Sequence, residues 1–540
     1  MQVPAQREGS ATSYKWVVAG VVIFGIFMSV LDSTIVNIAI PRLQSVFGAS
    51  LNDVQWVLTG YILAQGVATP LTGFFSDRMG IKRFYLLSLA GFTLGSALCG
   101  LAWSLPTLIF FRILQGVTGA FLVPLSTTLI YREFPPNERG TAMGVLGIPI
   151  LLAPALGPTV GGYLVTFASW QLIFYVNVPI GIIGLIMAAI FLRGGYTEGR
   201  ATFDLAGFAF SAVGLGALLY GLSDASADGW GSTKVLGFLL VGLLSLIMFT
   251  LIELNIARRG GNPLLDLRVF ANGPFATSNI ASVLVVFALF GGLFLIPVYL
   301  QDLRQLSAFQ AGLLLLPQAF ASMVAVIIGG RLVDRIGVRA VAIPGLALLA
   351  VANWKLSSLT LTMSYGQLQW YLILRSFSLG FCMQPFMVSA YATIKSEMLP
   401  QATAVNTALR FVASSLGVAA LSTVVQTQTQ VHYTRLAEQV TPASPLGHMV
   451  IQIQNVFMLK GASAAQAFSS AVQEIGLLIQ QQAYMLAMQD AFRLLVALSL
   501  IAFISAFFVQ SGSKSRAQHP KNEDEDDKAK QAREEAMLAV

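Results

Sequence analysis

Long apolar stretches separated by short charged segments run along almost the whole chain. Fourteen of them are about 20 residues or longer, the length that an α-helix needs to cross a bilayer core. Backbone groups inside lipid have no water partner, so such stretches form helices rather than open strands. The pattern predicts transmembrane helices at residues 16–40, 53–75, 84–104, 106–130, 140–165, 171–192, 204–222, 235–257, 273–299, 310–332, 340–360, 368–393, 402–425 and 491–509.

Composition supports a membrane protein. Of the 540 residues, 56% are hydrophobic and only 11% are charged, whereas a soluble domain carries roughly 25% charged residues. The first apolar stretch spans about 25 residues, longer than the ~7–15-residue core of a signal peptide. We therefore expect an all-α membrane protein of fourteen transmembrane helices, whose first helix is retained.

The distribution of basic residues predicts the orientation. If the N-terminus is cytoplasmic, the inner segments hold 22 of the 32 Lys and Arg residues, the outer segments hold six, and four lie within or at the ends of helices. The positive-inside rule then places both the N-terminus and the C-terminus in the cytoplasm. The net charge of +7 reflects this topology and indicates no nucleic-acid partner.

The sequence lacks the residue patterns that several kinds of chemistry require. Cys99 and Cys382 lie in apolar stretches and the three histidines lie outside them, so the spacing of a metal site or a disulfide framework is missing. The sequence has no G-x-x-x-x-G-K-[ST] loop and no evident nucleophile–base pair. We expect no enzyme activity, no cofactor, no metal and no ATP-driven pump.

Two inner loops resemble each other. The segment from Gly73 to Arg83 and the segment from Gly330 to Arg339 share an Asp-Arg-x-Gly core at a separation of 257 residues. Chance is the alternative, but Arg112 and Arg375 also occupy similar depths in equivalent helices. Related six-helix halves are a recurring transporter design. The predicted units are a cytoplasmic N-terminus (1–15), an N-terminal bundle (16–192), two inserted helices (193–260), a C-terminal bundle (261–510) with an extracytoplasmic segment (426–489), and a disordered charged cytoplasmic tail (511–540).

Six motifs occur in a recognisable order along the chain. They are Leu31–Pro41 in the first helix, Gly73–Arg83 after the second, Arg112–Gly119 in the fourth, Gly157–Gly162 in the fifth, Trp170–Pro179 in the sixth, and Tyr299–Gln301 followed by Ser307, Gly312 and Pro317. These motifs resemble those of the major facilitator superfamily. The best fit is its fourteen-helix drug:proton antiporter branch, which includes the EmrB and QacA efflux pumps.

The resemblance implies a function. It implies proton-coupled efflux of hydrophobic drugs or other small amphipathic molecules by alternating access, in a prokaryotic inner (plasma) membrane. The partners would be the lipid bilayer, hydrophobic substrates and protons. A lipid or metabolite exporter on the same fold is the alternative, and a receptor or scaffold without transport is a third hypothesis.

Asp32 is the most informative single residue, because it is the one carboxylate well inside a predicted helix. A carboxylate in the membrane usually faces a cavity or a partner. Counting at 1.5 Å per residue places Asp32 and Arg112 at similar depths, about 13 Å and 9 Å below the outer surface. We predict that this pair couples the protein to protons, and a static salt bridge between two helices is the alternative.

Other candidates follow from position and from the resemblance. Small residues allow close helix approach, so the Gly157–Gly162 motif either seals the cavity against leak or simply packs. Arg375 either reaches the interface or attracts anionic substrates. The candidate sets are the substrate cavity (Tyr61, Gln65, Gln115, Arg375), the cytoplasmic gate (Gly73, Asp77, Arg78, Gly80, Arg83, Asp334, Arg335) and the antiporter motif (Gly157, Pro158, Gly161, Gly162).

The outer segment 426–489 shows an apolar stripe. Phe468, Val472, Ile475 and Ile479 recur at helical spacing. An amphipathic helix of this kind lies on a membrane or docks a partner. EmrB-like pumps have a comparable segment and work with a periplasmic adaptor, so the resemblance implies such a partner here.

Overall fold

The computed structural model describes residues 8–194 and 203–509, and within these ranges the chain folds into helices without strands. The N-terminal bundle comprises α1 (Glu8–Ile35), α2 (Ile40–Phe47), α3 (Leu51–Ala68), α4 (Thr72–Met79), α5 (Ile81–Gly100), α6 (Leu105–Gly119), α7 (Leu122–Glu133), α8 (Arg139–Phe167), α9 (Leu172–Tyr175) and α10 (Asn177–Phe191). The inserted pair is α11 (Leu205–Asp228) and α12 (Thr233–Arg258).

The C-terminal bundle follows. It comprises α13 (Gly273–Val298), α14 (Ala308–Ile336), α15 (Val338–Leu356), α16 (Tyr365–Tyr391), α17 (Leu399–Glu438), α18 (Pro445–Leu459) and α19 (Ala464–Ala506). Short turns of helix join these elements: η1 (Val36–Ala39), η2 (Thr69–Leu71), η3 (Pro136–Glu138), η4 (Leu267–Ala271), η5 (Tyr299–Leu303) and η6 (Ser396–Met398). The predictions for residues 1–7 and 510–540 concern parts of the chain outside the described residues.

Twelve helical segments of the described chain are long and apolar enough to cross a membrane. The two other predicted spans, 53–75 and 84–104, do form helices, namely α3 with α4, and α5, but they are not among those twelve. A turn containing Pro70 interrupts the first of them, and α5 opens with Lys82 and Arg83. The all-helical fold is thus confirmed, whereas the count of fourteen spans stays a prediction.

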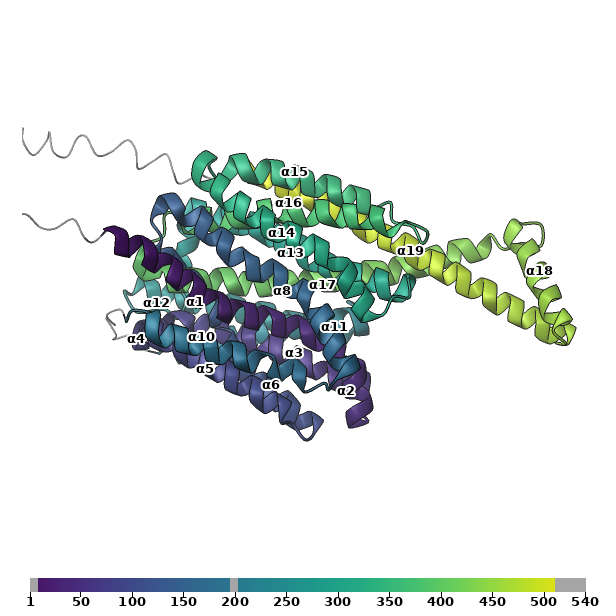
Figure 1. Cartoon of the computed structure of the whole chain (residues 1–540), viewed down its shortest axis with the longest axis horizontal. Coiled ribbons are helices and arrows are strands. Elements are labelled where there is room, and N and C mark those ends of the chain that lie inside the picture. Colours follow the sequence, from purple (N-terminus) through teal and green to yellow (C-terminus); the bar gives the residue numbers. More distant parts are fainter. Residues whose placement is uncertain (1–7, 195–202, 510–540) are drawn as a thin grey trace, which may run out of the picture.

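The two bundles lie side by side along their helices (Figure 1). Their main contact is between α8 and α14, which pack along much of their lengths. The inserted helix α11 packs against both α3 and α17, so it touches each bundle. At one end of this contact the indole N–H of Trp230 donates a 2.7 Å hydrogen bond to Thr423 Oγ1 of α17.

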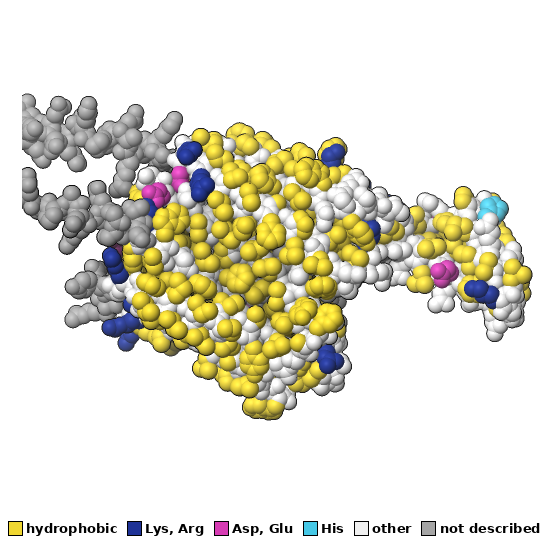
Figure 2. All heavy atoms as spheres, in the orientation of Figure 1, with side chains coloured by type: hydrophobic (Ala, Val, Ile, Leu, Met, Phe, Trp, Pro, Cys, Tyr) yellow, Lys and Arg dark blue, Asp and Glu magenta, His cyan; other side chains and the backbone are white. Residues whose placement is uncertain are grey.

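The surface of the bundles is apolar over a broad zone. Figure 2 shows hydrophobic side chains across the middle of the visible face, with Lys and Arg gathered at the end where α1 begins. On α12, Leu240, Leu243 and Leu251 are more than half exposed. A face of this kind would be unstable in water and is expected to contact lipid.

The outer segment 426–489 differs from the prediction of a loop carrying one amphipathic helix. The spans expected at 402–425 and 491–509 are only parts of α17 and α19, which continue beyond the bundle and, with α18, form a projecting hairpin (Figure 1). Ile475 and Ile479 are buried against Val450 of α18, while Phe468 and Val472 are exposed. Half of the predicted stripe therefore serves to hold the hairpin together.

Candidate functional site

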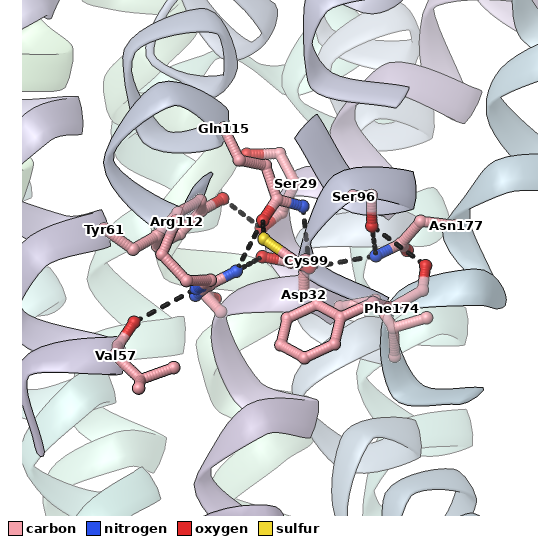
Figure 3. A network of polar contacts seen from close by, with 12 residues as sticks. Ser29, Asp32, Val57, Tyr61, Ser96, Cys99, Arg112, Gln115, Phe174 and Asn177 are labelled. Carbon is pink, nitrogen blue, oxygen red and sulfur yellow. Dashed lines mark hydrogen bonds and ion pairs between the residues drawn. The ribbon is translucent and has the colours of Figure 1, made fainter. Parts of the chain in front are cut away.

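A buried ion pair between Asp32 of α1 and Arg112 of α6 forms the centre of a polar network (Figure 3). Arg112 Nη1 donates to Asp32 Oδ2 at 2.5 Å, and both side chains are fully buried. The other carboxylate oxygen, Oδ1, accepts from Gln115 Nε2 at 3.0 Å and from Asn177 Nδ2 at 2.9 Å. The carboxylate thus receives donors from two further side chains besides the guanidinium.

The network also fixes the arginine. Arg112 Nε donates to the carbonyl oxygen of Val57 at 3.0 Å, and Nη1 also donates to Gln115 Oε1 at 2.8 Å. The guanidinium carbon lies 4.0 Å from the ring centroid of Tyr61. Nη2 has no hydrogen-bond partner among the described residues, so its two N–H donors are free.

Neither charge of this pair contacts water, so each depends on the other for its stabilisation. Two opposite charges removed from water are stable only when they are well paired and hydrogen-bonded. Protonating Asp32 would cancel one charge and leave the guanidinium uncompensated. The contact between α1 and α6 would then weaken, which favours a movement of these helices. The site is closed to water in this structure, so proton exchange requires such a movement.

The predicted cavity residues of the N-terminal bundle belong to the same network. Gln65 Nε2 donates to the Tyr61 hydroxyl at 2.9 Å, and that hydroxyl lies 3.3 Å from the Ser29 carbonyl oxygen that accepts from it. Tyr61, Gln65 and Gln115 are 0, 5 and 0% exposed. Contact of these side chains with a substrate would therefore need a rearrangement, and their role in binding stays a prediction.

Arg375 of α16 is buried rather than reaching the interface, since it is 2% exposed. Its Nη2 donates to the carbonyl oxygen of Ala288 at 2.7 Å, and Nε lies 3.2 Å from Asn353 Oδ1. Asn353 in turn donates to Ser499 Oγ at 2.9 Å. Among the described residues the hydrogen-bond partners of Arg375 are all neutral, whereas Arg112 pairs with a carboxylate.

At the end of the bundles where α1 begins, the gate candidate Asp334 joins the two halves. Its carboxylate caps the N-terminus of α8: the N–H groups of Gly140 and Thr141 each donate at 2.7 Å, and the Thr141 hydroxyl donates at 2.6 Å. A carboxylate at a helix N-terminus is favourable, because it faces the positive end of the helix dipole.

The equivalent Asp77 lies near the start of α17, close to Arg132 and Gln401. The two repeated glycines have the same backbone shape, with φ of +78° at Gly80 and +88° at Gly337. Only glycine adopts such angles readily, so the conformation supports the repeat. The remaining gate candidates differ in their surroundings. Gly73 packs on Gln401, whereas the side chains of Arg78, Arg83 and Arg335 are exposed.

The half-buried position of Asp77 predicts a pH-dependent gate. Burial raises the pKa of this carboxyl from 3.8 to about 6, despite the opposing effect of Arg132 and Gln401. Opening the gate would hydrate Asp77 and lower its pKa, so a proton binds the closed gate more tightly. The ratio of closed to open molecules should therefore rise as the pH falls through about 6, and it should level off near the ordinary pKa of an aspartate. The rise should be about tenfold at most, because solvent screens a half-buried group.

Pulsed electron resonance between spin labels at Asn137 and Ser396, exposed residues on opposite sides of the gate, would measure this ratio. Asp77→Asn should remove the pH dependence below neutrality. A distance distribution that opens on acidification would contradict the prediction.

The antiporter motif packs α8 against two neighbours. A Cβ atom at Gly157 would lie 2.4 Å from Thr34 Oγ1, and one at Gly161 would lie 3.0 Å from the carbonyl oxygen of Ile35. Gly162 faces α14 across the boundary between the halves, where an added Cβ atom would lie 3.3 Å from the backbone nitrogen of Phe309. Pro158 is one of three prolines inside α8. The motif thus brings α8 close to the turn of α1 that follows Asp32.

Two polar groups of importance were missed as site candidates. Asn177 was noted only as part of a motif, although its amide binds Asp32 directly. Glu253 lies near the end of the predicted span 235–257, so the sequence does not single it out, yet it is only 1% exposed within α12. Within residues 8–194 and 203–509 no three His, Cys, Asp or Glu side chains gather as a metal site would require.

Long helices with apolar outer faces, two helical bundles, and an ion pair buried inside the N-terminal bundle define a class, the polytopic membrane transporters. The family model of the Major Facilitator Superfamily matches residues 22–419, and the chain belongs to this superfamily. It is a multi-pass transporter of the inner (plasma) membrane, and its membership places it among transporters rather than enzymes.

Curated relatives agree with this assignment. The chain is 34% identical over 412 residues to the tetracenomycin C resistance and export protein of Streptomyces glaucescens, covering 75% of each chain. It is 31% identical over 422 residues to the multidrug export protein EmrB of Escherichia coli, covering 78% of this chain and 82% of EmrB. An uncharacterised transporter of the same type from Bacillus subtilis, YhcA, is 35% identical, covering 79% of each chain.

A solved structure supports the fold. The human organic anion transporter MFSD10 superposes with a TM-score of 0.59 at 16% identity, covering 92% of this chain and 99% of MFSD10. At that identity the likeness concerns the fold alone.

Proposed function

We propose that this protein exports hydrophobic or amphipathic small molecules in exchange for protons, by alternating access between its two bundles. The observation that carries the proposal is the fully buried Asp32–Arg112 pair with its shell of neutral donors. When one member of a buried charge pair is protonated, the other charge loses its partner, and the packing of the surrounding helices becomes less stable. The relatives named for drug and antibiotic export support the substrate class.

The proposed cycle uses the groups described above. With Asp32 ionised, Arg112 and Asn177 hold α1 to α6 and α10. A proton on Asp32 would release the guanidinium, and the bundles would rock about the α8–α14 contact. We further propose that α3 with α4, and α5, are the remaining spans of a fourteen-helix topology, with the gate end and both termini in the cytoplasm.

Reconstituted liposomes would test this function. With purified protein, an imposed pH gradient should drive ethidium against the direction of proton flow, and reversing the gradient should reverse the flux. A weakly acidic dye that does not itself carry protons across the bilayer provides a second substrate of opposite charge. Transport that ignored the gradient would overturn proton exchange and favour the export of a lipid or metabolite.

The hairpin formed by the ends of α17 and α19 with α18 is proposed to contact a partner outside the membrane. It stands away from the bundle and exposes Leu459, Phe468 and Leu477. Apolar residues exposed at a projecting tip are typical of interaction surfaces. A periplasmic adaptor of the kind implied by the resemblance is the partner that we propose.

A further inference from the structure

The inserted helices carry a second buried carboxyl site. Glu253 of α12 is 1% exposed, and neither of its carboxylate oxygens makes a hydrogen bond of normal geometry with a described group. The backbone N–H groups of Leu264 and Leu265 point toward this carboxylate and partly stabilise it. The Asp32–Arg112 mechanism makes no use of this group, and a buried carboxylate without a partner is costly.

Asp204 faces the same point. It caps α11 by accepting from the N–H of Gly207 with Oδ1 at 2.9 Å, while its other oxygen, Oδ2, is buried without a partner among the described residues. A Cβ atom built on Gly207 would lie 2.1 Å from Asp204 Oδ2 and 2.6 Å from Glu253 Oε1. The two free oxygens therefore flank one small space beside Gly207.

The surrounding charges do not neutralise the pair. The elements packed on α12 are α11 and the linker that contains η4. The linker contributes Asp266, a third carboxylate, and Arg268, which is committed to Asp266 through contacts of 2.7–3.1 Å. Arg258, in the last turn of α12, is exposed. Among the described residues, no cation bonds to Glu253 or Asp204.

We propose that Asp204 and Glu253 form a second proton-binding site, in which the two carboxyls share one proton near neutral pH. Like charges held this close cannot both ionise without a large penalty. One shared proton supplies the donor that the two free oxygens lack. The proton also allows the linker, with its buried Leu264 and Leu265, to close over Glu253.

The site is separate from Asp32 in both location and consequence. It joins the inserted helices to the linker that leads into the C-terminal bundle, and it involves none of the residues of the Asp32 network. Loss of its proton would place two negative charges beneath the linker. The inserted helices then have a chemical role: they make the packing of residues 261–272 sensitive to protonation.

Carbodiimide labelling of the full-length protein in liposomes would test the proposal. The O–H of a protonated carboxyl adds across one C=N bond of a hydrophobic carbodiimide, and the O-acylisourea that forms rearranges to a stable N-acylurea that mass spectrometry assigns to a residue. In the wild type, Glu253 should be labelled near neutral pH and should lose labelling as the pH is raised. Asp32, which is paired with Arg112, should remain unlabelled at the same pH.

The variants separate the pair from its surroundings. Asp204→Asn removes the like charge, so the pH at which Glu253 labelling is lost should fall by about one pH unit or more. Asp224→Asn is the matched control, because Asp224 lies on the same helix but pairs with Lys234; it should cause no shift. Arg200→Gln, outside the described residues, tests whether a cation from that segment pairs with the site, and it too should cause no shift.

Hydrogen exchange supplies an independent measurement. Protection of residues 261–272 should decrease as the pH rises through the midpoint found by labelling, and Glu253→Gln should make that protection independent of pH. A wild-type Glu253 that is unlabelled near neutral pH would overturn the proposal, whatever the variants do. A labelling midpoint that does not move in Asp204→Asn, or that moves in Arg200→Gln, would also overturn it.

Discussion

Replacing Asp32 with asparagine is expected to reduce gradient-driven transport by about a hundredfold or more, the range in which proton-transfer groups act. Asparagine keeps the size of the side chain and can still accept a hydrogen bond, but it cannot carry a proton at any working pH. Downhill flux in the absence of a gradient should fall far less. The measurement is the initial rate of ethidium movement in liposomes with and without an imposed pH gradient.

Stability measurements distinguish coupling from a static salt bridge. Asp32→Asn leaves the buried guanidinium of Arg112 without a counter-ion, which should cost about 3–5 kcal/mol of stability. The double variant Asp32→Asn with Arg112→Gln removes both charges and should recover much of that stability while transport stays lost. Recovery of both properties would show that the pair serves packing only.

A matched control completes this test. Asp53→Asn changes an exposed acid near the start of α3, whose side chain accepts from Ser50, and it should leave gradient-driven transport unchanged. Gradient-driven transport that survives in Asp32→Asn would remove Asp32 from the proton pathway.

The pairing of Asp32 with Arg112 was predictable because helix geometry is regular. Depth along a helix follows from a residue count, and two opposite charges at similar depth in an apolar bundle have few other partners. The rotational position of each helix was not predictable in the same way. That is why Asn177, which completes the carboxylate shell from α10, was not recognised as part of the site.

The two loops with an Asp-Arg-x-Gly core illustrate a different limit. The shared core predicts equivalent places for Asp77 and Asp334, and the glycine of each loop adopts a positive φ. The sequence did not indicate that Asp334 caps a helix of the opposite bundle, since such a contact depends on how the halves dock. Likewise, the polar C-terminal part of α17 and N-terminal part of α19 predict a loop that carries one amphipathic helix. In the structure both parts are continuous helix, because they pack with α18.

Glu253 shows how the choice of boundary hides a residue. It lies four residues from the end of the predicted span 235–257, where an acid is expected to reach water. In the structure the linker after α12 folds back, and Leu264 and Leu265 cover the carboxyl. A burial created by a returning loop leaves no trace in the local hydrophobic pattern.

Closing the gate should require glycine at position 140. A Cβ atom at Gly140 would lie 2.5 Å from the carbonyl oxygen of Gly330 and 2.6 Å from Asp334 Oδ1. Gly140→Ala alone therefore pushes α8 away from α14 and displaces the carboxylate that caps α8. The expected result is a longer distance between spin labels at Asn137 and Ser396, together with loss of gradient-driven transport.

Two comparisons make this expectation specific. Gly237→Ala, on α12, meets nothing within 4 Å and should change neither the distance nor transport. Asp334→Asn keeps the shape of the cap but loses its charge, so it should open the gate only partly, in line with the roughly 0.5–2 kcal/mol that a helix cap contributes. Because the clash at Gly140 involves backbone that cannot move aside without separating the bundles, its effect should exceed that of Asp334→Asn. A Gly140→Ala protein that closed and transported normally would show that the α8–α14 contact at this end is not the gate.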